Sequence, residues 1–136
     1  MAYQRKDPRS RQVVTVAKAS GALVSGQLVK KNGTSNNVTA FTADGVVFGI
    51  CVKAAASADA YVDIDIIQPG TWLVADVGTG TPASGDLKSC DAQAASPSLL
   101  VDVSGTTNND FLYMYNGTTT TVDVLPKKIE SITDNA

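Results

Sequence analysis

One short stretch of the chain, Val24-Ser25-Gly26-Gln27-Leu28, recurs as Ala83-Ser84-Gly85-Asp86-Leu87. In each copy, small residues lead to a glycine and then to an apolar segment. A glycine at such a point allows a positive φ, because it has no Cβ to clash with the backbone. We therefore predict that the two copies are matching corners of one β-module, each aiming an apolar strand into the core, and not binding loops.

Short β-type runs separated by turns surround these corners. In the clearest run, 61–66, apolar and polar residues alternate with a period of two, which predicts a half-buried strand. We expect Val62, Ile64 and Ile66 to face the core and Tyr61, Asp63 and Asp65 to face out. Similar runs lie at 13–16, 23–30, 38–42, 46–52, 71–74, 99–103, 111–115 and 119–125.

The spacing of these runs is typical of an all-β fold, a compact β-barrel or β-sandwich of short antiparallel strands. Only 54–60 has helix propensity, and it is too short for more than a turn. We divide the chain into an extended basic N-terminal arm (1–11), a single β-domain (12–125) and a polar C-terminal tail (126–136).

Charge separates the arm from the body. The net charge is −2, yet the arm holds four of the 11 Lys and Arg residues and one of the 13 acidic residues. Its cations are Arg5, Lys6, Arg9 and Arg11. We interpret the arm as a peptide that docks on an acidic protein surface, for example by adding a strand to a neighbouring sheet. Because the body is acidic, we expect no nucleic-acid partner.

The composition argues against catalysis. The chain has no histidine, the commonest general base and metal ligand. Asp63 and Asp65 share one strand face and could bind a cation or share a proton, but a solvated strand face explains them better. Cys51 and Cys90 are expected to be reduced thiols, with a disulfide between them as the alternative. We predict no catalytic, cofactor or metal site, and no apolar run is long enough to span a membrane.

Two aromatic features are candidates for a subunit interface. Trp72 is either a core residue or an interface anchor. The run 111–115 places its aromatic residues on one face and Leu112 and Met114 on the other, and a strand that is apolar on both faces can be covered by a second subunit. The candidate interface residues are Trp72, Phe111, Tyr113 and Tyr115.

The order of these elements resembles that of the small bacteriophage capsid decoration proteins, also called cement or head-stabilising proteins. Over roughly residues 12–103, the matching pieces are Ser25-Gly26-Gln27-Leu28-Val29, Val47-Phe48-Gly49-Ile50-Cys51, the alanine-rich 54–60, the alternating 61–70 and Ser84-Gly85-Asp86-Leu87. Each piece consists of common turn or strand residues, so the shared order carries the resemblance. The stretch from 104 onward matches less well.

The resemblance implies a non-enzymatic, β-tulip-like virion protein, often a homotrimer at symmetry axes of the shell. It would be assembled in the host cytoplasm and would sit on the outer surface of the capsid. An extended terminal segment would lace onto the major capsid protein, which gives Arg5, Lys6, Arg9 and Arg11 a capsid-binding role. The alternative is a β-sandwich adhesion or carbohydrate-binding accessory module of a phage tail or fibre, with Trp72, Tyr113 and Tyr115 as a stacking platform.

Overall fold

The computed structural model describes residues 4–5, 12–33, 35–41, 46–85, 87–94 and 99–129, and this part of the chain is all-β, without a helix. The predicted fold class is confirmed. The strands are β1 (Gln4–Arg5), β2 (Val13–Ala17), β3 (Leu28–Lys31), β4 (Val38–Ala40), β5 (Val47–Cys51), β6 (Tyr61–Ile66), β7 (Leu73–Thr79), β8 (Lys88–Ala94), β9 (Leu99–Asp102), β10 (Phe111–Tyr115) and β11 (Thr121–Pro126).

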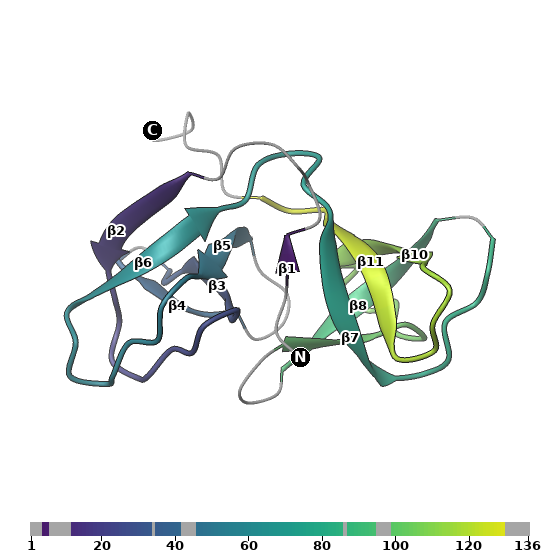
Figure 1. Cartoon of the computed structure of the whole chain (residues 1–136), viewed down its shortest axis with the longest axis horizontal. Helices are drawn as coiled ribbons and strands as arrows, with labels where there is room; N and C mark the ends of the chain where they lie inside the picture. The colour runs from purple at the N-terminus through teal and green to yellow at the C-terminus, as the bar shows by residue number, and fades with distance from the viewer. Residues whose placement is uncertain are drawn as a thin grey trace.

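The strands form two sheets that lie side by side (Figure 1). Each sheet contains a set of five consecutive strands that we call a unit. The first unit has the order β2-β6-β5-β3-β4, and its outer strands meet at a parallel bridge between Lys18 and Val38. The second unit has the order β7-β11-β10-β8-β9, and β9 pairs parallel with β7 to close a five-stranded barrel. All other pairings between strands are antiparallel in the part of the chain described.

The two units have the same topology. In each, the five strands taken in chain order are arranged first, fifth, fourth, second, third. In both units the end of the first strand also pairs parallel with the third strand. The pairs are Lys18 with Val38 in the first unit and Val77 with Val101 in the second. The repeated phrase precedes the second strand of each unit, with Gly26 at φ +84° and Gly85 at φ +118°. The predicted corners therefore match, but they belong to two copies of one five-stranded unit.

The two units share a hydrophobic core. One buried cluster contains Phe41, Val47 and Leu28 of the first unit together with the interior of the second. The rings of Phe41 and Phe111 lie 6.3 Å apart, and the Val47 amide donates to the Lys128 carbonyl at 2.8 Å. A smaller cluster, which includes Val29, Val62 and Ile64, fills the first unit alone. The region that we assigned as one domain thus contains two five-stranded units with a continuous core.

Several local expectations need correction. Residues 54–60 form turns and a bridge from Ala55 to Leu23, with no helical turn. The run 23–30 becomes a strand only from Leu28. In β6, the three apolar residues are buried and Tyr61 is 64% exposed as predicted, but Asp65 is only 3% exposed. Strand β8 was largely missed, because its sequence, KSCDAQA, has little hydrophobic character.

Both cysteines are free thiols in the interior, and no disulfide joins them. Cys90 lies in β8 and is fully buried. Burial, followed by the nearby carboxylates of Asp91, Asp110 and Asp102, raises the pKa of the Cys90 thiol from 9.0 to about 12.

The Cys90 thiol is expected to make stability depend on alkaline pH. The native state keeps this thiol neutral while the unfolded chain ionises near pH 9.0, so its contribution is intact below pH 9 and is lost as pH rises toward 12. Relative to Cys90→Ala, the parent should lose about 2 kcal/mol between pH 8 and about pH 10.5. Urea denaturation of both proteins across this range measures the difference, and parallel pH profiles would contradict it.

Candidate functional site

The described part of the N-terminal arm adds a strand to the second unit. Strand β1 pairs antiparallel with the start of β7, with Gln4 opposite Val74 and Arg5 opposite Leu73. In Figure 1, β1 lies between the two sheets. Further along β7, from Asp76 onward, the strand pairs with β9 instead. The backbone of Arg5 therefore takes part in a sheet of its own chain, whereas the predicted arm residues Lys6, Arg9 and Arg11 lie outside the described residues.

The four candidate interface residues do not form one surface. Phe111 is fully buried and Tyr113 is 3% exposed, and both pack in the shared core, so they are removed from the interface prediction. Trp72 and Tyr115 are half-buried and remain accessible. As predicted, the aromatic residues of β10 lie on one face of the strand, and Leu112 and Met114 lie on the other. The aromatic face, however, points into the barrel. With Tyr113 buried, the stacking platform of the carbohydrate-binding alternative is not assembled.

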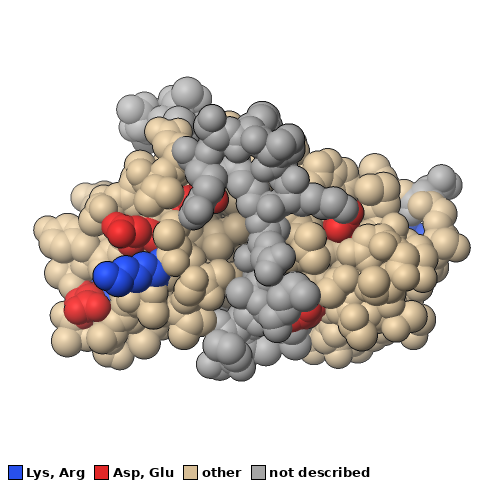
Figure 2. Space-filling view, in the orientation of Figure 1, with Lys and Arg blue, Asp and Glu red and all other residues tan. Residues whose placement is uncertain are grey.

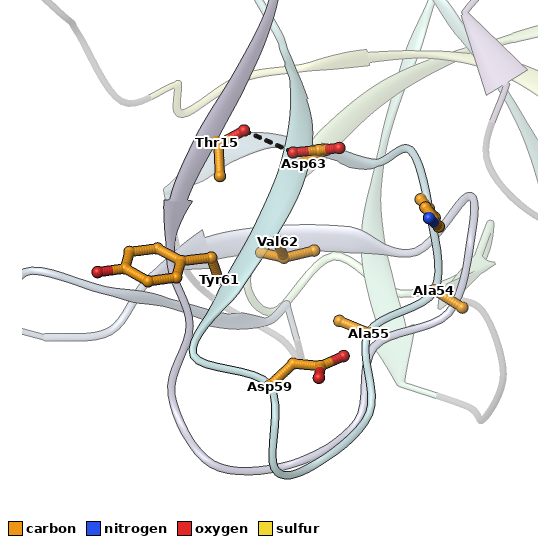
Figure 3. Close-up of a pocket in the computed structure, with 8 residues that line it drawn as sticks. Thr15, Ala54, Ala55, Asp59, Tyr61, Val62 and Asp63 are labelled. Atoms are coloured by element: carbon orange, nitrogen blue, oxygen red, sulfur yellow. Dashed lines mark hydrogen bonds between the residues drawn. The ribbon is translucent and has the colours of Figure 1, made fainter.

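A hollow on the outer face of β2 and β6 brings polar residues together (Figure 3). Its volume is about 190 Å³. The Thr15 hydroxyl donates to Asp63 Oδ1 at 2.6 Å, and Asp59 Oδ2 accepts the Ala56 amide at 2.8 Å. Figure 2 shows acidic and basic side chains next to one another on the same unit. The hollow is lined by Thr15, Lys53, Ala54, Ala55, Asp59, Tyr61, Val62 and Asp63.

A buried lysine fixes one wall of this hollow, and sequence reasoning missed it. Lys18 is 7% exposed, and its ammonium donates to the carbonyls of Gly21 at 2.8 Å, Ala19 at 3.0 Å and Ser57 at 3.3 Å. The bond to Ser57 ties the 54–60 loop to the end of β2. A buried ammonium with three carbonyl acceptors is satisfied, so Lys18 holds structure and does not present a charge.

The carboxylate pair in β6 does not form an open site. Asp63 is half-buried and bonded to Thr15, while Asp65 is buried. Within the residues that the structure describes, no group of three or more His, Cys, Asp or Glu side chains is placed to hold a metal ion. The geometry supports the structural interpretation of this pair.

No protein-family model matches the chain, and no curated protein matches it. In the described ranges, no helix has the length and apolar character to cross a membrane. Of the arm residues that sequence reasoning proposed as functional, Arg5 pairs through its main chain with β7 of its own chain.

Proposed function

We propose that this chain is a bacteriophage capsid decoration protein that binds the outer surface of the major capsid protein shell and stabilises the head without enzymatic activity. The observation that carries the proposal is the strand pairing of Gln4 and Arg5 with β7, because it gives the basic arm a main-chain mode of docking. An arm that pairs with an edge in its own chain has the backbone properties needed to pair with an edge on the capsid.

The body of the chain suits such a role. Two five-stranded units with a continuous core form a base for the arm. The order of the sequence elements resembles that of cement proteins, as set out above. In an oligomer, contacts that are weak for one subunit add together when several subunits engage neighbouring capsid proteins. Since the chain would bind only assembled capsid protein, binding would stabilise the shell by mass action.

Co-sedimentation with undecorated heads of the phage that carries this chain tests the proposal. The full chain is expected to pellet with the heads saturably, and deletion of residues 1–11 is expected to weaken binding by a hundredfold or more, within the roughly 10²–10⁴ range of avidity losses. A full chain that stays in the supernatant would contradict the function.

A matched variant separates the charge of the arm from its strand pairing. Replacing Arg5, Lys6, Arg9 and Arg11 by glutamine keeps the length of the arm and removes its cations. If charge guides docking, this variant binds weakly, and the binding of the parent falls as salt is raised. A truncated chain that binds as well as the full chain would exclude a role for the arm while leaving the decoration function intact.

A further inference from the structure

The two units differ at one edge. In the second unit, the start of β7 pairs with β1, whereas the corresponding strand of the first unit, β2, has no such partner among the described residues. The repeat defines the correspondence. Val14 and Thr15 pair with Ile64 and Asp63 of β6 as Leu73 and Val74 pair with Val124 and Asp123 of β11. Thr15 is therefore the counterpart of Val74, the residue opposite Gln4.

The backbone of β2 presents hydrogen-bonding groups at this edge. The Lys18 amide donates to Ala60, and Gln12 accepts from the Ile66 amide. Because bonding alternates along an antiparallel strand, the even-numbered residues of β2 face β6, and Val13, Thr15 and Ala17 direct their N–H and C=O groups to the opposite edge. Among the described residues, strand β4 meets that edge at its end, through the parallel bridge between Lys18 and Val38, which flanks Lys18 with Ala17 and Ala19.

We propose that the N-terminal arm of a second copy of this chain adds as a strand to the β2 edge. The same arm already pairs with the corresponding edge of its own second unit. On β7 it is confined to Leu73 and Val74, since β9 pairs from Asp76, but on β2 the described structure leaves the edge open from Val13 to Val16, before the bridge to Val38. An arm that moves from β7 of its own chain to β2 of another copy can therefore pair over more residues than it does on β7. Because this arm is also the segment proposed above to dock on the capsid, the contact between copies is proposed for the chain free of heads, and its tests use no heads.

Charge complementarity favours the arm as the occupant. On the sheet face that carries Thr15, Asp63 of β6 lies opposite it, and Asp59 lies with Lys53 in the lining of the same hollow. If the arm keeps the register that it has on β7, Gln4 stands opposite Thr15, and Lys6 of the incoming arm stands opposite Val13, on the sheet face that also carries Asp63 of β6. Val13 is 47% exposed and can cover the aliphatic part of that lysine.

The contact joins two different surfaces, the arm of one copy and the β2 edge of another. Such a heterologous contact produces a closed ring when the rotation between copies closes, and a trimer is one of the rings that it can form. The inference therefore gives the predicted homotrimer a specific contact.

Cysteine trapping in the full chain tests the pairing directly. Residues directly opposite on antiparallel strands have Cα atoms about 5 Å apart, within the range that a disulfide spans. Under mild oxidation, the chain with Gln4→Cys and Thr15→Cys should give covalent dimers and larger species on a non-reducing gel. The chain with Gln4→Cys and Val74→Cys should instead form a disulfide within one chain and run as a monomer. A Gln4→Cys/Thr15→Cys chain that stays monomeric would overturn the proposal. Equal dimer formation by Thr15→Cys alone would assign the edge to β2 of another copy and would also overturn it.

A pair of substitutions at Thr15 tests the role of the edge in solution. Thr15→Pro removes the N–H that points to the open edge and leaves the ladder to β6 intact, a change tolerated on edge strands. Thr15→Val keeps the N–H, removes the hydroxyl and reproduces the residue found at Val74. In sedimentation velocity, Thr15→Pro should dissociate at roughly tenfold higher concentration than the parent or more, and Thr15→Val should assemble like the parent. A monomeric parent, or equal assembly of the two folded variants, would overturn the proposal.

Discussion

Gly49→Ala is expected to be one of the most destabilising single substitutions in this chain. It should lower the free energy of unfolding by about 3 kcal/mol. Gly49 lies in β5 between Val29 of β3 and Ile66 of β6. An added Cβ would collide with the carbonyl oxygen of Asp65 and with Cγ2 of Ile64. Because the first of these atoms belongs to the backbone of a neighbouring strand, it cannot move away without disturbing the sheet. In a chain of this size, the melting temperature should fall by about 10 °C.

Gly117→Ala is the matched control. Gly117 has a φ of +91°, and an added Cβ would have nothing within 4 Å. This substitution should cost only the backbone strain of a positive φ, about 1 kcal/mol. Urea denaturation of the two variants measures both values. A Gly49→Ala chain as stable as Gly117→Ala would show that β5 and β6 do not approach as closely as the structure has them.

The second large effect is expected at Asp91, in β8. Its carboxylate is 9% exposed and accepts three backbone amides, from Asn109 at 2.7 Å and from Thr107 and Asn108 at 2.9 Å. Asn109 has a φ of +53°, so these bonds stabilise an otherwise unfavourable turn between β9 and β10. Asp91→Asn keeps the shape of the side chain but replaces one acceptor oxygen by an amide group that donates. The free energy of unfolding should therefore fall by about 3 kcal/mol.

Asp102→Asn serves as the comparison. Asp102 is half-buried and, among the described residues, accepts from the amide and hydroxyl of Ser104. Its substitution should cost about 1 kcal/mol. Thermal denaturation gives the two stabilities, and hydrogen exchange should show faster exchange of the 107–109 amides in Asp91→Asn only. Equal effects of the two substitutions would show that Asp91 does not anchor the loop.

The local pattern of the sequence was sufficient to predict most of the strands. The alternation in 61–66 predicted β6 and the burial of its three apolar residues, and the repeated phrase located two glycines with positive φ. The arrangement of strands in the sheets could not be predicted in this way, because the pairing of β2 with β6 or of β7 with β9 joins segments far apart in the sequence. The repeated phrase was correctly interpreted as a corner, but its recurrence was not recognised as a repeat of the whole five-stranded unit.

The polar interior was less predictable for a physical reason. Alternation assigns Asp65 to the polar face of β6, yet the fold buries it. Asp91 likewise alternates with the apolar Cys90 and Ala92 in β8, and its burial is compensated by loop amides that the pattern cannot reveal. In β10 both faces are apolar, so sequence alone could not distinguish the face that points inward.

The candidate site was predicted in part. Charge separation along the sequence identified the arm, and its pairing with a sheet edge was among the docking modes expected for it. The hollow beside β2 was not predicted, because Thr15, Lys53 and Asp59 come together only when the 54–60 loop folds against the sheet. The open edge of β2 became recognisable only through comparison with its occupied counterpart on β7.

The most direct test of the account is the number of copies bound per major capsid protein when undecorated heads are saturated with the full chain, compared with the same ratio in purified virions. A capsid decoration protein occupies repeated positions on the shell, so we predict saturation at a fixed ratio in the heads and the same ratio in virions. Absence of the chain from both saturated heads and virions would contradict the account.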